Sequence, residues 1–125
     1  RRPGVTGDAL LQILECRLDN IVWRSGLAAT RPQARQLVNH GHFQVNGKKV
    51  DIPSYQVRAA DVITVKDVSR DLIMIQHAVD TMDRVTPEWI DVDLGDRKVT
   101  VRDLPSRDQI DTAIQEQLIV ELYSK

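Results

Sequence analysis

The sequence predicts an α+β protein in which helices pack on a small antiparallel sheet. Two stretches near the start, residues 6–25 and 31–40, place apolar side chains at helical intervals of three and four. From His42 the interval changes to two, and an Asn46-Gly47 pair, typical of a hairpin turn, follows at once. After residue 70 a helical stretch is again followed by an alternating one. The order of helix and then strands therefore occurs twice.

The first helix is expected to run without interruption over residues 6–25. It should end at Gly26, because glycine readily adopts the left-handed conformation that follows a helix. Arg17 and Arg24 lie seven positions apart, away from the apolar face. Their guanidinium groups are therefore expected to project from the same side.

The second helix is expected to begin after Thr30, whose side chain suits the N-cap position, and Pro32 suits its first turn. It should end at Gly41. The strands that follow are expected on either side of the hairpin turn and within residues 55–67.

The second half of the chain predicts a third helix within residues 71–84 and a hairpin within residues 88–104 that turns at 94–96. The tail, residues 114–125, is a dense apolar run. Its spacing leaves helix and strand open.

A chain of 125 residues can bury one modest core or form two small lobes that share one. We expect a lobe of two helices on a small antiparallel sheet over residues 14–69, and a second helix-plus-hairpin lobe from residues 1–13 and 70–125. Trp89 is expected to pack in the second lobe. The apolar residues expected to be buried together in the first lobe are Leu14, Leu18, Val22, Leu37, Val38, Phe43, Val45, Val62, Ile63 and Val65.

Charge divides the chain into a basic and an acidic half. Residues 1–58 contain nine Lys and Arg against four Asp and Glu, whereas residues 59–125 contain eight against fourteen. The net charge of −1 hides this asymmetry, which favours an anionic partner for the first half. No apolar run approaches the roughly 20 residues of a membrane span, and the single Cys16 cannot form an internal disulfide. These features favour a soluble protein in a reducing compartment.

No pattern of residues indicates an enzyme. The sequence has no Gly-rich phosphate loop, and Cys16 lies among apolar residues, where a packed thiol is the simpler interpretation. His40 and His42 are one residue apart at a turn and do not converge readily on a metal ion. The carboxylates after Ala60 are interpreted as a solvated face. We therefore expect neither a metal nor a cofactor.

The cations of the first half fit a nucleic-acid surface. Guanidinium groups bind phosphate oxygens in pairs, and the Gln, Asn and His side chains between them suit sugars and base edges. The alternative is that mixed charge only keeps the domain soluble, and composition alone leaves both interpretations open. The cations concerned are Arg17, Arg24, Arg31, Arg35, Lys48 and Lys49.

Three separated blocks of the chain resemble one known family. The stretches "RLDNIVWRSG", "RPQARQLVNHGHFQVNGKKVDIPSY" and "IQEQLIVELYSK" are similar, in this order, to the family of small-subunit ribosomal protein four, bacterial or organellar, after which the S-four RNA-binding domain is named. The resemblance covers essentially the whole chain and identifies residues 14–69 with that domain. It implies the following RNA-binding residues: Arg17, Arg24, Arg31, Gln33, Arg35, Gln36, His40, His42, Asn46, Lys48, Lys49, Ser54 and Tyr55.

The resemblance also implies a biological role. It implies a structural constituent of the small ribosomal subunit that binds a junction in the five-prime domain of small-subunit rRNA, aids early assembly and lines the mRNA entry channel. The implied partners are rRNA, mRNA and small-subunit ribosomal proteins three and five, without a membrane. The implied location is a cytoplasmic bacterial ribosome or an organellar ribosome.

Two features depart from the family pattern. Members of the family carry a further N-terminal segment, of which "RRPGVTG" resembles the last piece. Ala60 stands where a glycine before Asp61 is common, so the turn there is expected to be tighter or rotated.

Two alternative functions remain open. One is a fragment of an RNA-modifying enzyme with an S-four domain, such as a pseudouridine synthase, which residues 17–19 superficially resemble. The other is a stand-alone stress or ribosome-rescue RNA-binding protein. The block at the C-terminal end argues against both.

Overall fold

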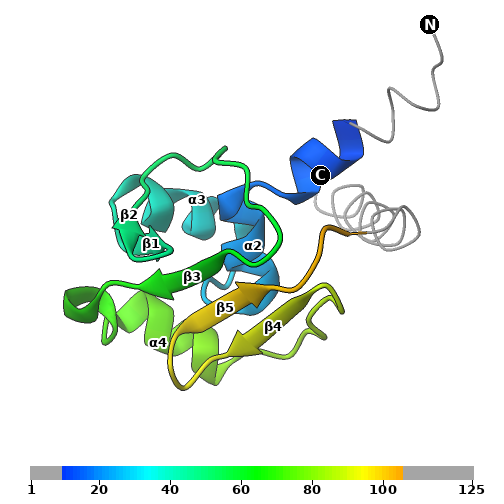
Figure 1. Cartoon of the computed structure of the whole chain (residues 1–125). Helices are drawn as coiled ribbons and strands as arrows, with labels where there is room; N and C mark the ends of the chain where they lie inside the picture. Colours follow the sequence, from blue (N-terminus) through cyan, green and yellow to red (C-terminus); the bar gives the residue numbers. More distant parts are fainter. Residues whose placement is uncertain (1–9, 106–125) are drawn as a thin grey trace, which may run out of the picture.

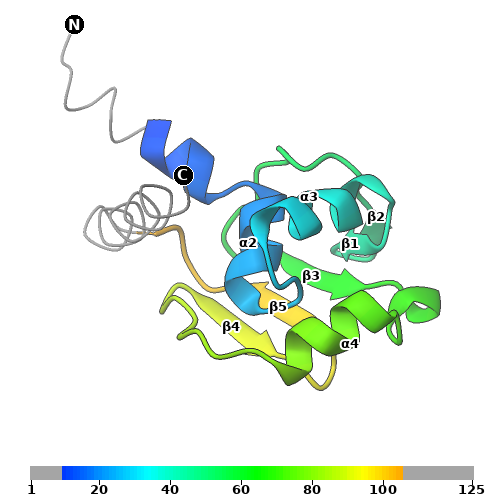
Figure 2. The ribbon, with the colours of Figure 1, turned by 180° about the vertical axis from the view of Figure 1, so that it is seen from behind.

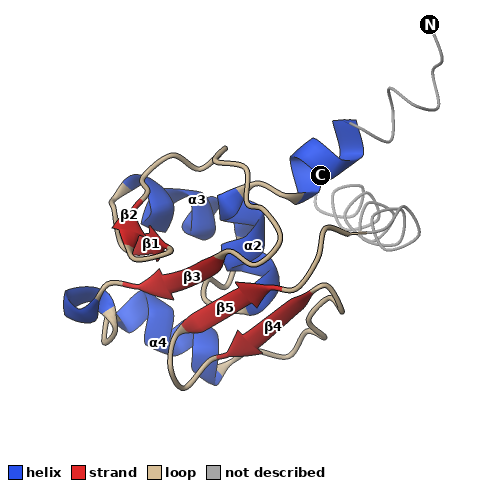
Figure 3. Cartoon of the chain, in the orientation of Figure 1, coloured by secondary structure: helices blue, strands red, loops and turns tan. Residues whose placement is uncertain are grey.

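The computed structural model describes residues 10–105, in which helices are followed by strands twice, as the sequence predicted for an α+β protein (Figures 1 and 3). Within these residues no helix is long and apolar enough to cross a membrane. The tail for which helix and strand were left open lies outside the described residues. The named elements are α2 (Leu18–Ser25), α3 (Arg31–Asn39), β1 (Phe43–Val45), β2 (Lys48–Lys49), β3 (Val62–Val65), the 3-10 helix η1 (Asp67–Ser69), α4 (Ile73–Asp80), β4 (Ile90–Asp93) and β5 (Lys98–Val101).

The strands form one antiparallel sheet in the order β2-β1-β3-β5-β4. Helices α2, α3 and α4 lie on one face of this sheet, as Figure 1 shows from the sheet side and Figure 2 from behind. The opposite face carries polar side chains on neighbouring strands. One layer of helices on one layer of sheet thus encloses the core between them.

The register of the strands directs their apolar side chains toward the helices. Val45 is paired with Ile63, and Ile63 with Val99, and all three are buried. Neighbouring residues of a strand point to opposite faces, so Val62 lies on the other face and is only partly buried. The prediction that Val62 is buried in the core was therefore wrong, because its side chain is only partly buried.

The first helix is not continuous, which corrects the prediction for residues 6–25. Residues 10–15 are helical, but Arg17 is extended (φ −66°, ψ 142°) and a new helix, α2, begins after it. The N–H groups of Leu18 and Asp19 donate to the carbonyl oxygens of Tyr55 at 2.9 Å and Pro53 at 3.1 Å. The loop of residues 53–57 thus supplies the acceptors that an uninterrupted helix would have supplied itself.

The break also corrects the expected position of Leu14. This side chain is 43% exposed, because the short helix of residues 10–15 lies beside the sheet rather than over it (Figure 1). The other apolar residues expected in the core of the first lobe are buried, apart from Val62.

The two expected lobes share one sheet and one core. Strand β5, from the second lobe, pairs with β3 of the first, and Phe43, Trp89 and Val99 belong to the same buried cluster. Trp89 is 4% exposed, so the prediction that it packs is confirmed. The domain boundary at residue 69 stays a prediction. Both the sheet and the core contain residues from each side of it.

Candidate nucleic-acid interface

Helix α3 begins with the cap that the sequence predicted. The side-chain oxygen of Thr30 accepts a hydrogen bond from the N–H of Gln33 at 3.2 Å, and Pro32 lies in the first turn. Gln33 in turn accepts one from the N–H of Ala29 through Oε1 at 2.8 Å. The first bond satisfies an N–H group that a helix start otherwise leaves without a partner, and the second ties the residue before the cap to the first turn of α3. Gln33 is therefore engaged in holding the start of α3.

Three exposed cations of the first half, with an exposed histidine, gather where α3 meets the β1–β2 hairpin. This α3–hairpin surface consists of Arg35, Gln36, His40, Lys48 and Lys49, all of which are exposed. The two elements lie side by side in Figures 1 and 2. The Lys49 side chain crosses the α3–β1 turn, since a Cβ atom built on Gly41 would lie 2.9 Å from Lys49 Cε. The hairpin therefore places one of its ammonium groups over the end of α3.

The hairpin turn has the predicted geometry. Asn46 (φ 52°) and Gly47 (φ 82°) both adopt the left-handed conformation that a two-residue type I′ turn requires. The Asn46 side chain donates to Asp61 Oδ1 at 3.0 Å and accepts from the N–H of Val62 at 2.9 Å. Asn46 thus ties the turn to the start of β3. Its side chain stabilises the hairpin and leaves the lysines after it to face outward.

His42 is bound to the body of the protein rather than directed outward. Its Nδ1 lies 2.8 Å from Ser69 Oγ, and its ring is 6.3 Å from that of His40 in an edge-on arrangement. Partial burial lowers the pKa of His42, and the positive charges of Lys66 and His40 lower it further. His42 therefore tends to be neutral, whereas His40 is the exposed member of the pair.

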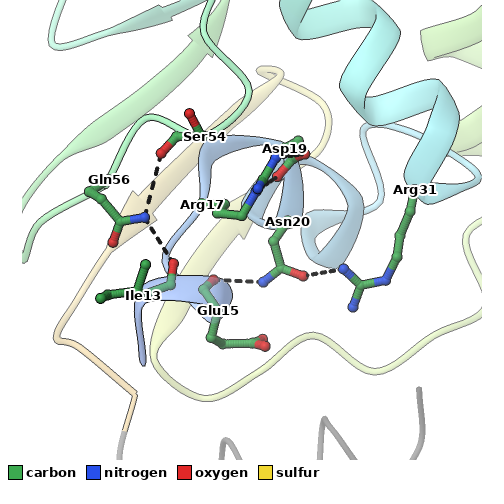
Figure 4. A network of polar contacts seen from close by, with 8 residues as sticks. All are labelled: Ile13, Glu15, Arg17, Asp19, Asn20, Arg31, Ser54 and Gln56. Carbon is green, nitrogen blue, oxygen red and sulfur yellow. Dashed lines mark hydrogen bonds and ion pairs between the residues drawn. The ribbon is translucent and has the colours of Figure 1, made fainter. Parts of the chain in front are cut away.

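Arg17 lies at the start of α2 and contacts an adjacent carboxylate. Its Nε and Nη2 donate to the two oxygens of Asp19 at 3.1 and 3.0 Å, and the pair is partly exposed. The backbone of Arg17 forms an isolated antiparallel bridge with Gln56, whose side chain reaches the carbonyl oxygens of Ile13 and Ser54 (Figure 4). Ser54 is exposed, whereas the ring of Tyr55 packs partly buried against the core. Arg17 is thus held beside the loop of residues 53–57.

Arg24 does not project beside Arg17, as the uninterrupted helix predicted. It is 9% exposed, and its Nε donates to Glu15 Oε1 at 3.1 Å, so the two side chains form a buried ion pair. The break at Arg17 rotates α2 relative to the preceding turn and removes the expected seven-residue spacing. The guanidinium group of Arg24 is therefore not available on the surface in this conformation.

Arg31 is connected to the same interior network. Its Nη1 donates to Asn20 Oδ1 at 2.8 Å, and Asn20 Nδ2 donates to the carbonyl oxygen of Glu15 at 2.6 Å (Figure 4). Asn20 is 3% exposed, so this bridge lies inside the molecule. It links the first residue of α3 to the helical turn that precedes α2.

Three arginines surround the indole ring of Trp23. The guanidinium carbons of Arg24, Arg31 and Arg84 lie 4.7, 4.3 and 4.6 Å from the ring centroid, within the range of cation–π attraction. Burial lowers the pKa of Arg84, the charge of Asp83 opposes this shift, and that of Arg24 adds to it. Sequence reasoning missed Arg84, because a single arginine after the third helix carries no spacing signal.

The described residues contain no group of three or more His, Cys, Asp or Glu side chains that is able to hold a metal ion. Cys16 is 3% exposed, and burial together with the nearby charge of Glu15 raises the pKa of its thiol to about 11. The interpretation of Cys16 as a packed thiol is confirmed. The exposed cations and amide groups of the α3–hairpin surface are able to bind anions.

Comparison with known proteins agrees with this arrangement. The S4 domain family matches residues 16–63. The chain is 58% identical, over its full length, to the small ribosomal subunit protein uS4 of Saccharopolyspora erythraea, of which it covers 63%. It is 56% identical to the protein of that name from Desulforamulus reducens, again over its full length and 61% of the relative. With that from Anaeromyxobacter sp. it shares 57% identity, over 98% of the chain and 59% of the relative.

The chain thus spans less than two thirds of the length of the curated relatives it matches. Residues 16–63, which match the S4 domain, include the α2–α3 pair and the hairpin. Over its whole length the chain is thus similar to the uS4 proteins of the small ribosomal subunit, and its residues 16–63 match the S4 domain.

Proposed function

We propose that this chain is a structural, non-catalytic component of the small ribosomal subunit that binds the five-prime domain of small-subunit rRNA. The observation that carries the proposal is the α3–hairpin surface, where exposed Arg35, His40, Lys48 and Lys49 lie within the S4 domain. Three of these side chains carry a full positive charge, and exposed Gln36 adds hydrogen-bonding groups beside them. Such a surface binds the phosphate backbone of a folded RNA and recognises its shape.

The remaining residues expected to bind RNA divide by what their side chains already contact. Arg17, before the start of α2, and Ser54, in the loop of residues 53–57, are at least partly exposed. We propose that they add contacts to RNA outside the α3–hairpin surface. The side chains engaged in the interior, the caps or the hairpin turn are Arg24, Arg31, Gln33, His42, Asn46 and Tyr55. In the proposed complex they shape the surface rather than touch the phosphates.

We propose that the acidic half of the chain faces away from the rRNA. Asp91, Asp93 and Asp96 are exposed on the β4–β5 hairpin at the far edge of the sheet from β2. Phosphate groups repel such a surface, so it faces solvent or a basic protein. We propose from the family resemblance that its neighbours are small-subunit proteins three and five near the mRNA entry channel. The same resemblance supports a bacterial cytoplasmic ribosome.

The test is a filter-binding titration against the five-prime domain of small-subunit rRNA, with double-stranded RNA of equal length as the control ligand. The variant Lys48→Glu, Lys49→Glu is compared with Lys98→Glu, Arg102→Glu, which changes the net charge equally on the other hairpin. We expect the first variant to lose affinity about tenfold or more and to lower the salt slope by about 2, since two phosphate contacts disappear. The second variant should bind nearly as the unmodified chain does. Equal losses in both would show that net charge, rather than this surface, drives binding.

A fragment of an RNA-modifying enzyme is the less favoured candidate. The stretch that resembles a pseudouridine synthase contains Asp19, and this carboxylate is paired with Arg17 at the start of α2. The full-length similarity to uS4 proteins also gives no support to an attached modifying domain.

A further inference from the structure

Arg84 lies outside the residues that match the S4 domain, yet its side chain reaches into the helix pair of that domain. Its Nη2 donates to the carbonyl oxygens of Trp23 at 2.6 Å and Ala28 at 3.3 Å, and its Nη1 to that of Ala29 at 3.3 Å. All three acceptors belong to the end of α2 or to the turn that leads to α3. One guanidinium group thus donates hydrogen bonds to carbonyl groups from the end of α2 to Ala29.

This turn needs donors because it is largely interior. Leu27 and Ala28 are fully buried, and residues 26–30 form no regular element. The carbonyl group of Trp23 lies in the last turn of α2, so no residue four positions later in the helix donates to it. The N–H of Gly26 also donates to it, at 3.1 Å. Buried carbonyl groups without partners are costly, so the five donors of an arginine suit this position.

A second contact comes from the same segment. Gly26 has φ 92°, and a Cβ atom built there would lie 2.6 Å from Met82 Sδ. The sulfur of Met82 therefore occupies the space that a side chain at residue 26 would fill. Met82 covers the beginning of the α2–α3 turn, and Arg84 binds its carbonyl groups up to Ala29.

The turn determines where Arg31 is placed. Arg31 is the first residue of α3, and its guanidinium group shares the ring of Trp23 with that of Arg84, at 4.3 and 4.6 Å from the centroid. Both arginines therefore depend on the same indole, and Arg84 is also bonded to the carbonyl group of that tryptophan. A displacement of Arg84 would release the ring and the turn together.

We propose that Arg84 is a positioning residue for RNA binding. It fixes the α2–α3 turn and Trp23, and with them the inward-held side chain of Arg31 that anchors the start of α3. Helix α3 is thereby placed to present Arg35 to RNA, and Arg84 does not contact RNA itself. Both of its Nη atoms already donate to backbone carbonyl groups, which leaves them poorly placed for phosphate. The predicted effect on RNA affinity rests on the proposed function. The predicted effect of Arg84 on the α2–α3 turn and on Trp23 does not depend on that function.

The first arm of the test measures RNA affinity with Arg84→Lys and Arg84→Met. Lysine keeps the charge but lacks the planar fork, so a positioning role predicts that both variants lose affinity alike, by about three- to tenfold. The salt slope should change little, because the cations of the α3–hairpin surface remain in place. The matched control is Arg102→Met, which removes an exposed arginine on the other hairpin and should change affinity less than about twofold.

A double-mutant cycle with Arg31→Met separates positioning from direct contact. If Arg84 acts through Arg31, then Arg84→Lys has little further effect once Arg31 is already replaced. If Arg84 bound a phosphate itself, the two losses would add and lysine would recover part of the binding. That result would overturn the proposal.

The second arm uses the free protein and needs no RNA. In both Arg84 variants the NMR signals of the Arg31 Nε–H group and the Trp23 indole N–H should shift, and the amides of residues 27–29 should exchange faster. The indole signal of Trp89, on the other side of the core, should stay in place and report that the variant is folded. Unchanged Arg31 and Trp23 signals in Arg84→Lys would overturn the proposal. If the unmodified chain did not bind rRNA, the proposed function would be refuted but the positioning of the turn by Arg84 would not. The NMR measurement would then decide whether Arg84 positions the turn.

Discussion

Glu15 and Arg24, nine positions apart, form an ion pair inside the protein. Glu15 Oε1 lies 3.1 Å from Arg24 Nε, and the two side chains are 2% and 10% exposed. The pair joins the helical turn of residues 10–15 to α2 across the extended Arg17. The chain can therefore bend at that position without separating its two helical pieces.

Replacement of Glu15 by Gln should destabilise the protein by about 3 kcal/mol, because it leaves the buried charge of Arg24 without a counterion. The free energy of unfolding in urea measures this loss. The matched control is Asp91→Asn, which breaks an exposed pair with Arg102 at 3.6 Å and should cost less than about 1 kcal/mol. Similar costs for the two variants would mean that the interior pair contributes no more than a surface pair.

Ala60 offers a stabilising substitution. It adopts φ 73°, in the left-handed region, while its N–H donates to the carbonyl oxygen of Val101 at 2.7 Å. The side chain of alanine disfavours this conformation by about 1–2 kcal/mol, and the extra flexibility of glycine in the unfolded chain offsets about half of that. Ala60→Gly should therefore raise the free energy of unfolding by about 0.5–1 kcal/mol.

The comparison for this prediction is Ala59→Gly, at the exposed neighbouring position whose φ is not positive. That variant should be neutral or slightly destabilising. Equal effects at both positions would show that the conformation of Ala60 carries no strain.

His42 should make stability depend on pH. Its folded-state pKa is lowered by burial and by the charges of Lys66 and His40, so the unfolded chain binds the proton first as the pH falls. The unfolding free energy should therefore decrease as the pH drops below the ordinary pKa of histidine toward the folded value, and level off beyond it. Above the ordinary value this contribution is constant.

His42→Gln should reduce this decrease at pH values below the ordinary pKa of histidine, whereas His77→Gln, at an exposed position on α4, should preserve it. Urea unfolding at several pH values provides the measurement. A pH profile that both substitutions alter equally would contradict the assignment to His42.

Cys16 should report unfolding through its reactivity. It is the single cysteine, it is buried, and its thiol has a pKa raised to about 11 by burial and by Glu15. At about pH 8 the native thiol should react with iodoacetamide far more slowly than an unfolded cysteine. The reagent cannot easily reach the buried sulfur, and only a small fraction of the thiol is in the reactive thiolate form. The rate should rise through the same urea concentrations at which the circular dichroism changes. Fast alkylation of the native chain would show that the region around Cys16 opens without global unfolding.

The elements whose signals are local were predictable from the sequence. The cap at Thr30, the Asn46-Gly47 turn and the pairing of Ile90 with Val101 and Val92 with Val99 all follow from residues close together in the chain. The exposed cations of the α3–hairpin surface were predicted for the same reason, since helix and hairpin periodicity fix which side chains face outward.

The features that were missed depend on distant residues. The break at Arg17 arises from hydrogen bonds to Pro53 and Tyr55, and these acceptors leave no trace in the helical spacing of the first residues. Arg84 contacts the turn after α2 across more than fifty positions of sequence. Arg24 was expected at the surface because its spacing from Arg17 was counted along a helix that the structure interrupts.

The pairing of Ile63 with Val99 has a consequence for the chain as it emerges from synthesis. Until residues 98–101 are made, the edge of β3 that faces away from β1 has no strand to bond, and such an open edge invites pairing with other chains. After β3 is made, residues 66–101 must be produced before that edge is closed. A shortened product that ended directly after β3, at residue 65, would keep the exposed cations of α3 and the hairpin, but it would be prone to aggregate along β3.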